Sequence, residues 1–233
     1  MIGAPTIVFD LDGTLVDTAP DLVATLNTIF VREGLAPVDY ASARNMVGGG
    51  ARAMIERGLQ AEGRKLAAAE IDRLFHDFIA HYGDHIADRS RPFEGIEAAL
   101  DELAHRGCRL AVCTNKLERL SIRLLDALGL SQRFAAICGQ DTFGVQKPDP
   151  EILRRTIGRA GGRPDVAVMV GDSATDIATA RAAGLPVIGV EFGYSEPPVA
   201  ALRPDRLVSR FADVPAAVFD LIGDQGDEFA RPS

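Results

Sequence analysis

Short apolar runs recur along the chain, and the stretches between them carry apolar residues at helical spacing. Runs rich in β-branched residues predict buried strands, and they occupy residues 6–10, 109–113, 166–170 and 186–190, with weaker candidates at 134–138 and 206–208. Helical spacing that ends at glycine predicts helices at residues 94–105, 116–128, 150–160 and 174–183. Strands that alternate with helices predict a parallel sheet covered on both faces, with functional residues at the carboxyl ends of its strands.

One segment departs from this alternation. Residues 17–90 contain helical patterns and no convincing strand. Apolar stripes there predict the amphipathic helices of a small bundle: Leu22, Val23, Leu26, Ile29 and Phe30; Met54, Ile55 and Leu59; and Ile71, Leu74, Phe75, Phe78 and Ile79. The expected fold class is α/β. A Rossmann-like parallel sheet forms a core domain of residues 1–16 and 91–224, an all-helical cap domain of residues 17–90 is inserted into it, and residues 225–233 form a frayed tail.

Composition and charge narrow the classes of function. The chain has 233 residues, 47% of them hydrophobic, and a formal net charge of −8 without a cluster of Lys or Arg. That charge argues against nucleic acid as a partner, because the phosphate backbone is also negative. Cys108, Cys113 and Cys138 are an odd set without metal-type spacing, so we expect small buried core residues. Without a signal-peptide pattern or an apolar run near the ~20 residues that span a bilayer, we expect a soluble cytoplasmic protein, monomeric or homodimeric, with no membrane partner.

Two carboxylates stand at the end of the first predicted strand. Asp10 and Asp12 are two residues apart, so their side chains can project toward one point. Like charges held this close are costly unless a cation or a proton relieves them, and a hard cation such as Mg²⁺ prefers oxygen ligands. The alternative is that both residues only form the turn, as Asp before Gly often does.

Two further motifs carry groups that suit phosphate. Thr114 and Asn115 follow a predicted strand and offer a hydroxyl and an amide to phosphate oxygens. Either residue can instead cap the helix that follows. Lys147 stands in a segment whose backbone two prolines fix, so it can supply a positive charge for phosphate. The alternative is an exposed lysine before a helix.

The last motif is acidic. Asp172 follows a strongly apolar predicted strand, and Asp176 comes one helical turn later. Paired acids in this arrangement are typical of metal ligands and their supporting groups, although Asp172 or Ser173 can also act as a helix cap. For each motif alone, a purely structural role is an acceptable explanation. For all four motifs together, it would require four strand ends to carry carboxylates, a hydroxyl and a lysine by accident.

In this order the motifs resemble those of the haloacid dehalogenase superfamily, and the resemblance covers essentially the whole chain. Residues 10–14 match the DxDGT motif of that family, and the helical segment after them resembles the cap of its helical-cap subgroup. The resemblance implies a phosphatase with Asp10 as nucleophile and Asp12 as general acid/base. An acid at position 12 favours ester hydrolysis, because an alkoxide leaving group needs a proton. The other three motifs match at Thr114, Lys147, Asp172 and Asp176.

The same resemblance implies a set of ligand contacts. Mg²⁺ is expected on Asp10, the backbone carbonyl of Asp12, and Asp172. The phosphate of a small phosphorylated metabolite is expected beside Leu11, Thr114, Asn115 and Lys147. Asp176 and Ser173 are expected to support these residues, with Asp176 orienting Lys147 or a water on the metal.

Within the superfamily, the chain resembles the phosphoglycolate phosphatases most. The similarity lies in residues 10–22, 47–53 and 113–116, with a weaker contribution from Tyr194 and Ser195. It implies hydrolysis of 2-phosphoglycolate to glycolate through an aspartyl-phosphate. The substrate carboxylate is then expected to meet the cap at Gly48, Gly49, Gly50 and Arg52, by backbone N–H groups and a guanidinium. The alternative is that the glycine run is only a flexible loop between helices.

Two other functions remain open from the sequence. The first keeps the chemistry and changes the substrate, as in a sugar-phosphate phosphatase or a β-phosphoglucomutase-like mutase. The second is a non-catalytic binding or regulatory member, which we expect to have lost the nucleophile or the acids of the metal site. The chain retains all of these residues.

Overall fold

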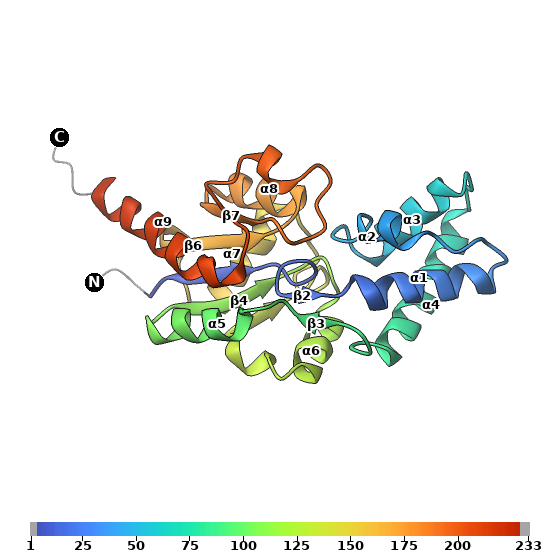
Figure 1. The fold of residues 1–233 in the computed structure, drawn as a ribbon, viewed down its shortest axis with the longest axis horizontal. Helices are drawn as coiled ribbons and strands as arrows, with labels where there is room; N and C mark the ends of the chain where they lie inside the picture. The colour runs from blue at the N-terminus through green and yellow to red at the C-terminus, as the bar shows by residue number, and fades with distance from the viewer. Residues whose placement is uncertain (1–3, 229–233) are drawn as a thin grey trace.

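Six parallel strands form a single sheet at the centre of the larger part of the molecule (Figure 1). The computed structural model describes residues 4–228. The sheet order is β5-β4-β1-β6-β7-β8. The strands are β1 (Thr6–Phe9), β4 (Arg109–Cys113), β5 (Ala136–Cys138), β6 (Ala167–Gly171), β7 (Val187–Val190) and β8 (Arg206–Val208). All six predicted strands are confirmed, and β1 lies between β4 and β6.

Helices cover both faces of this sheet, as the alternating pattern predicts. Ile7 and Phe9 of β1 belong to the apolar cluster on one face, and Val8 belongs to the cluster on the other, because side chains alternate along a strand. The first cluster includes residues of α5 (Ile96–His105), α6 (Glu118–Ala127) and α9 (Val214–Glu228). The second includes residues of α7 (Pro150–Arg159) and α8 (Ala174–Ala183). The predicted α/β fold class is confirmed.

The helical segment forms a separate bundle at one end of the molecule (Figure 1). It consists of α1 (Ala19–Arg32), α2 (Tyr40–Arg44), α3 (Ala51–Ala61) and α4 (Ala68–Asp84). The three predicted apolar stripes meet in one cluster, which also includes Leu120 of α6. The short helix α2 has no counterpart in the predictions, because five residues leave too little periodicity to recognise.

A small antiparallel ribbon joins the bundle to the sheet. It pairs β2 (Val16–Asp17) with β3 (Arg91–Pro92). The expectation of no strand from residue 17 onward is therefore wrong at Asp17, since a two-residue strand has no recognisable pattern. Asp21 on α1 connects the two chain segments that join the bundle to the sheet. Its Oδ2 accepts hydrogen bonds from the backbone N–H and the hydroxyl of Ser90, which precedes β3, both at 2.7 Å.

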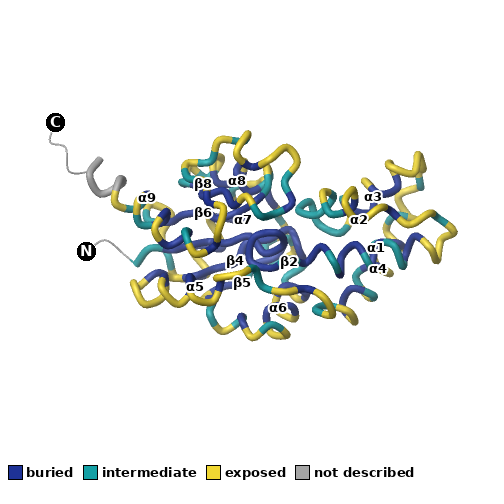
Figure 2. Tube along the Cα trace, viewed as in Figure 1, coloured by how far each residue is buried: buried dark blue, intermediate teal, exposed yellow. Residues whose placement is uncertain are grey.

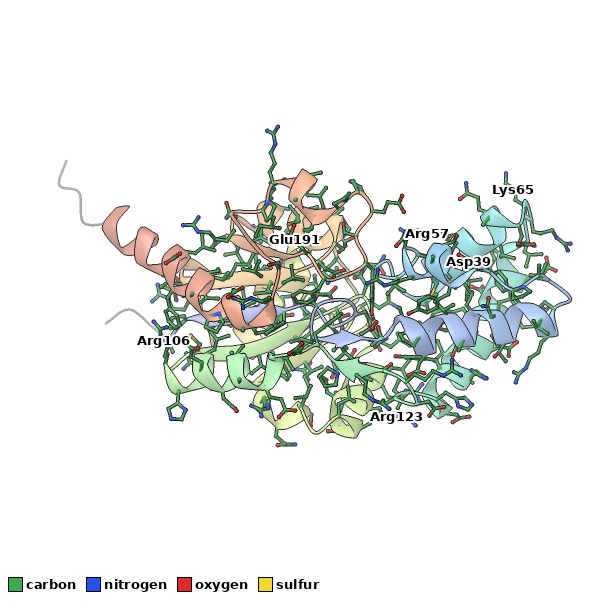
Figure 3. All side chains as sticks on the ribbon, in the orientation of Figure 1. Asp39, Arg57, Lys65, Arg106, Arg123 and Glu191 are labelled. Carbon is green, nitrogen blue, oxygen red and sulfur yellow. The ribbon has the colours of Figure 1, made fainter. Side chains whose placement is uncertain are left out.

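The distribution of burial follows this architecture. Figure 2 shows the strands of the sheet as the most continuously buried part of the chain, while charged side chains such as Lys65 and Arg106 lie at the surface in Figure 3. Cys108, Cys113 and Cys138 are free and buried, as predicted. None of the helices within residues 4–228 is long and apolar enough to cross a membrane.

The end of the chain differs from the prediction. Helix α9 continues to Glu228, past residue 225, where the tail was predicted to begin. Polar residues and glycine lower the propensity for helix, but they do not prevent the extension of a helix that packing has already nucleated. Residues 229–233 of the predicted tail lie outside the described residues.

Candidate active site

The carboxyl ends of three neighbouring strands bring the sequence motifs together. Asp10 follows β1, Thr114 follows β4, and Asp172 follows β6. Because β4 and β6 flank β1 in the sheet, these three residues leave it at the same edge. Asp10, Thr114 and Asp172 are 2%, 1% and 3% exposed, so they form a buried polar group rather than a surface turn.

Lys147 links two of the buried carboxylates. Its Nζ lies 2.8 Å from Oδ1 of Asp10 and 2.6 Å from Oδ1 of Asp176. Asp176 is held in turn by Ser173, the N-cap of α8, whose hydroxyl donates to Oδ2 of Asp176 at 2.7 Å. The expectation that Asp176 orients Lys147 agrees with this geometry, and Ser173 supports Asp176 as well as capping the helix.

Asp172 is fixed by groups from two other segments. Its Oδ1 accepts a hydrogen bond from the hydroxyl of Thr14 at 2.9 Å, and its Oδ2 accepts one from the backbone N–H of Tyr194 at 2.8 Å. Two glycines make this close approach possible. A Cβ at Gly13 would lie 2.6 Å from Oδ2 of Asp172, and one at Gly193 would lie 2.3 Å from the same atom.

The net negative charge of this cluster favours binding of a divalent cation. Asp10, Asp172 and Asp176 offer carboxylate oxygens within 4.8 Å of one another, and all three residues are buried. Lys147 is the one ammonium paired with them among the described ion pairs, so three ionised carboxylates leave a net charge of −2. Oxygen ligands of this kind suit a hard cation, which would offset that charge.

The pKa values show the same imbalance. Burial, followed by the charge of Asp176, raises the pKa of Asp10 to about 8 against the opposing effect of Lys147. Burial and then Asp176 raise the pKa of Asp172 to about 7. Burial by itself would lower the pKa of Lys147, but the charges of Asp10 and Asp176 outweigh it and hold that pKa above its ordinary range. Lys147 therefore stays protonated, and the carboxylates around it are short of positive charge.

Asp12 has different partners from Asp10. Its Oδ1 accepts a hydrogen bond from the hydroxyl of Thr18 at 2.7 Å and lies 3.0 Å from Nζ of Lys116. Its carboxylate is not part of the three-acid cluster, so only its backbone carbonyl remains in the expected metal ligand set. Asp10 and Asp12 therefore have different surroundings, which suit them to different roles.

Two of the residues expected to contact phosphate, Leu11 and Lys147, contact Asp10 directly. The backbone N–H of Leu11 donates to Oδ1 of Asp10 at 2.7 Å, while the Leu11 side chain is fully buried in the core. Asn115 holds the backbone of Lys147: its Oδ1 accepts from the Lys147 N–H at 2.9 Å, and its Nδ2 donates to the Lys147 carbonyl at 3.2 Å. The hydroxyl of Thr114 accepts from the N–H of Lys116 at 3.2 Å. Asn115 therefore positions Lys147, a role that the sequence did not indicate.

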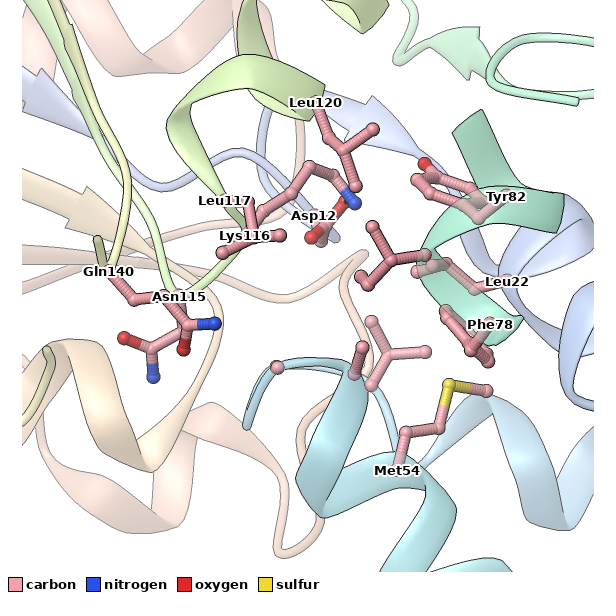
Figure 4. Close-up of a pocket in the computed structure, with 15 residues that line it drawn as sticks. Asp12, Leu22, Met54, Phe78, Tyr82, Asn115, Lys116, Leu117, Leu120 and Gln140 are labelled. Carbon is pink, nitrogen blue, oxygen red and sulfur yellow. Dashed lines mark ion pairs between the residues drawn. The ribbon is translucent and has the colours of Figure 1, made fainter. Parts of the chain in front are cut away.

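A small cavity separates the cap from this group of residues (Figure 4). Its volume is about 30 Å³, and Asp12, Asn115 and Lys116 line it on the core side. The cap side is mainly apolar and includes Leu22, Met54 and Phe78. This space is far smaller than the pockets that usually enclose small ligands, so we expect the cap to move away when a phosphate ester enters.

Contacts between α2 and a loop of the core keep the cap in this position. Nη2 of Arg44 donates to the carbonyl of Gly193 at 3.0 Å, and its guanidinium lies 4.7 Å from the ring centroid of Tyr194. Nδ2 of Asn45 donates to Glu196 at 2.8 Å. The loop that carries Gly193 also holds Asp172 through Tyr194, so the closed cap is connected to the acidic cluster.

Only two of the four cap residues predicted to contact a substrate line the cavity. Gly48 and Gly50 line it, whereas Gly49 and Arg52 do not. Arg52 is paired with Asp72 and has a half-exposed side chain, with its guanidinium 5.3 Å from the ring centroid of Phe75. Arg52 does not reach the cavity in this structure, because its position on α3 directs it to solvent and to α4. Its contact with substrate stays a prediction.

Four polar residues of the site were not singled out from the sequence. They are Thr14, Thr18, Tyr82 and Lys116, and each is buried. Lys116 directly follows Asn115 in the second motif, so its position next to a strand end was a usable signal. Tyr82 comes four residues after Phe78 and continues the apolar stripe of α4, so its pattern is that of a core residue.

Comparisons with known proteins identify the family and its relatives. A family model described as haloacid dehalogenase-like hydrolase matches residues 7–190. The phosphoglycolate phosphatase of Mesorhizobium japonicum is 51% identical over 207 residues, which cover 89% of this chain and 91% of that protein. The phosphoglycolate phosphatase of Agrobacterium fabrum is 47% identical over 223 residues, which cover 96% of each chain.

Solved structures share the fold. A crystal structure described as a predicted phosphoglycolate phosphatase from Haemophilus somnus superposes with a TM-score of 0.83 at 29% identity, covering 91% of this chain and 96% of that one. A β-phosphoglucomutase from Clostridium difficile has a TM-score of 0.78 at 19% identity, covering 98% and 99% of the two chains. At that identity the second likeness extends to the fold alone.

Proposed function

Because the chain belongs to the haloacid dehalogenase-like hydrolase family, we propose that it hydrolyses 2-phosphoglycolate to glycolate and phosphate, through a phosphorylated Asp10 and with Mg²⁺ as its cofactor. The predictions of the family and of a phosphatase within it are confirmed. The substrate is proposed because the relatives named above are phosphoglycolate phosphatases at up to 51% identity. The cofactor is proposed because three buried carboxylates share a single ammonium.

The observation that carries the proposed chemistry is the separation of Asp10 from Asp12. Asp10 accepts its hydrogen bonds on Oδ1, from Leu11 and Lys147, which leaves Oδ2 available to phosphorus or to a metal ion. Asp12 lies toward the cavity with Thr18 and Lys116. These separate surroundings support a nucleophilic role for Asp10 and proton exchange with the leaving group for Asp12.

The reaction then runs in two steps. A carboxylate oxygen of Asp10 attacks phosphorus, the bond from phosphorus to the ester oxygen breaks, and Asp12 gives its proton to the departing alkoxide. In the second step Asp12 accepts a proton from water, the water oxygen attacks the phosphorus of the aspartyl-phosphate, and Asp10 is released with inorganic phosphate. Lys147 holds positive charge beside Asp10 throughout, while Thr114 can donate to a phosphoryl oxygen.

A divalent cation would be held by Asp10, Asp172 and the backbone carbonyl of Asp12. Bound there, Mg²⁺ supplies positive charge between the nucleophile and the phosphoryl oxygens. Thr14 and the N–H of Tyr194 already fix both oxygens of Asp172. These supporting contacts orient the ligand before any metal arrives.

The cap selects the substrate and excludes water. Since the cavity is about 30 Å³ with the cap in place, a small ester must be enclosed after the cap opens and closes again. Enclosure protects the phosphorylated intermediate from water that is not positioned for attack.

A substrate panel tests the proposed function. Phosphate release should be measured for 2-phosphoglycolate, a hexose 6-phosphate, β-glucose 1-phosphate and p-nitrophenyl phosphate. We expect kcat/KM for 2-phosphoglycolate to exceed that for each sugar phosphate by about tenfold or more, which corresponds to about 1.4 kcal/mol of differential transition-state binding. The opposite preference would favour a sugar-phosphate phosphatase, and conversion of glucose 1-phosphate to glucose 6-phosphate would favour a mutase.

A further inference from the structure

A positively charged side chain lines the cavity between cap and core, and the two reaction steps described above give it no role. Among the described residues that line it, Lys116 alone carries such a charge. Lys116 is buried, and its Nζ lies 3.0 Å from Oδ1 of Asp12 and 4.5 Å from the ring centroid of Tyr82. An ammonium has three N–H donors, so the contact with Asp12 leaves donors that a ligand in the cavity can use.

The same cavity contains a hydroxyl without a partner. Tyr82 is 1% exposed, its hydroxyl lies beside Lys116, and no residue that the structure describes accepts its proton. Lys116 beside it has donors only, so the phenolic proton lacks an acceptor. Figure 4 shows this hydroxyl on the side of the cavity near Lys116. Buried polar groups are nearly always hydrogen-bonded, and an acceptor on a bound ligand would satisfy this one.

The position of Asp12 indicates which part of the substrate could supply such an acceptor. Asp12 must approach the ester oxygen that it protonates. In 2-phosphoglycolate the carboxylate carbon is only two bonds from that oxygen. A cation in direct contact with Asp12 is therefore near a carboxylate at this spacing, and the hydroxyl of Tyr82 lies on the same side of the cavity as this cation.

From these contacts we propose that Lys116 and Tyr82 form a subsite for a carboxylate carried on the carbon next to the ester oxygen. The proposal rests on the phosphatase function above and names its substrate class, the 2-phosphoryloxy carboxylates. Lys116 binds one carboxylate oxygen while it holds Asp12 toward the ester, and Tyr82 donates to the carboxylate. Lys116 is thus a positioning residue for Asp12 as well as a specificity residue, whereas Tyr82 affects specificity alone.

The test compares two esters of the same length. One is 2-phosphoglycolate, and the other is 2-hydroxyethyl phosphate, which lacks the carboxylate. Tyr82→Phe is expected to lower the ratio of their kcat/KM values by about tenfold, the effect of one hydrogen bond to a charged group. Lys116→Met is expected to lower the ratio by about a hundredfold and to lower kcat on both esters, and Lys116→Arg should recover part of the ratio because it keeps the charge.

Two surface residues of the cap provide matched controls. Tyr40→Phe and Lys65→Met alter an exposed tyrosine and an exposed lysine that do not line the cavity, and they should leave the ratio unchanged. Tyr82→Phe should not lower Tm, because its hydroxyl has no hydrogen bond to lose. A lowered Tm with an unchanged ratio would assign Tyr82 a structural role and overturn the subsite.

A binding measurement separates this proposal from the proposed function. Calorimetry in an Asp10→Asn background should show weaker binding of 2-phosphoglycolate when Tyr82→Phe is added, with little change for 2-hydroxyethyl phosphate. If the wild type hydrolyses neither ester but this difference persists, the phosphatase function fails and the subsite stands. If the wild type hydrolyses both esters and no variant changes their ratio or their binding, the subsite fails and the phosphatase function stands.

Discussion

The two walls of the cavity are held in place in different ways. On the core side, Asn115 of the wall holds the backbone of Lys147. Behind it Asp10, Lys147 and Asp176 are at most 2% exposed, and ion pairs of 2.8 and 2.6 Å join them. On the cap side, the wall is mainly apolar, and the hydroxyl of Tyr82 has no partner within the described structure. Removing a member of the core network leaves a buried charge unbalanced, whereas changing the cap wall alters only the space that the leaving group enters.

This difference separates chemistry from selection. The phosphoryl group is the same in every monoester, so the residues that surround it can be fixed rigidly by hydrogen bonds. The leaving group differs between esters, and the wall that meets it belongs to a bundle that must move to admit it. Core substitutions should therefore slow all esters by a similar factor, while substitutions facing the leaving group should change their relative rates.

Asp10→Asn is expected to have the largest effect. The variant keeps the shape of the side chain but removes the nucleophile, so phosphate release from 2-phosphoglycolate and from p-nitrophenyl phosphate should both fall by about 10⁴-fold or more. Circular dichroism should show an unchanged fold, and Asp126→Asn, at an exposed position of α6, is the matched control. A folded variant that retains a few per cent of activity on either ester would exclude Asp10 as the nucleophile.

Metal removal should also affect all esters together. EDTA should stop phosphate release, because the cluster of Asp10, Asp172 and Asp176 would be left with one compensating ammonium. Mg²⁺ should restore activity better than Ca²⁺, which prefers a larger and looser set of ligands. Full activity in a chelator, with no residual metal by elemental analysis, would contradict this account of the core.

The pH dependence of metal binding offers a finer test of the same cluster. The pKa values of Asp10 and Asp172 are raised to about 8 and about 7, first by burial. Carboxyls with raised folded-state pKa values stabilise the fold below their unfolded value of about 3.9, and this contribution is lost as the pH rises through 7 to 8. The Tm of the metal-free protein should therefore fall from about pH 6 to about pH 8.5, and the increase in Tm on adding Mg²⁺ should grow over that range, because the ligands must release protons. An increase that shrinks as the pH rises would contradict the assignment of these ligands.

Arg52→Ala is expected to have the smallest effect. Its guanidinium pairs with Asp72 at the surface and does not line the cavity. An exposed ion pair contributes little, so kcat/KM should stay within about twofold on both 2-phosphoglycolate and p-nitrophenyl phosphate. A loss confined to 2-phosphoglycolate would mean that Arg52 reaches the carboxylate when the cap opens or closes, as the sequence had indicated.

The core side of the site could be predicted because it depends on local patterns. Apolar runs identify β1, β4 and β6, and parallel strands end at one edge of a sheet, so Asp10, Thr114 and Asp172 had to lie near one another. Lys147 was identified by its fixed backbone, although its hydrogen bonds with Asn115 depend on two segments that are distant in sequence.

The cap side could not be predicted in the same way. Which face of α3 meets the core depends on packing against other helices, and this decides that Gly50 lines the cavity while Arg52 does not. Tyr82 continues an apolar stripe, so only the structure shows that its hydroxyl lacks a partner. The β2–β3 ribbon has two residues in each strand, which is too short for any period to be recognised.

The central claim is that the phosphoryl group is transferred to Asp10, and trapping the protein with Mg²⁺ and BeF₃⁻ tests it most directly. A crystal structure of that complex should show beryllium bonded to a carboxylate oxygen of Asp10, with its fluorides within hydrogen-bond reach of Thr114 and Lys147. An adduct on any other side chain, with Asp10 left unmodified, would contradict the claim.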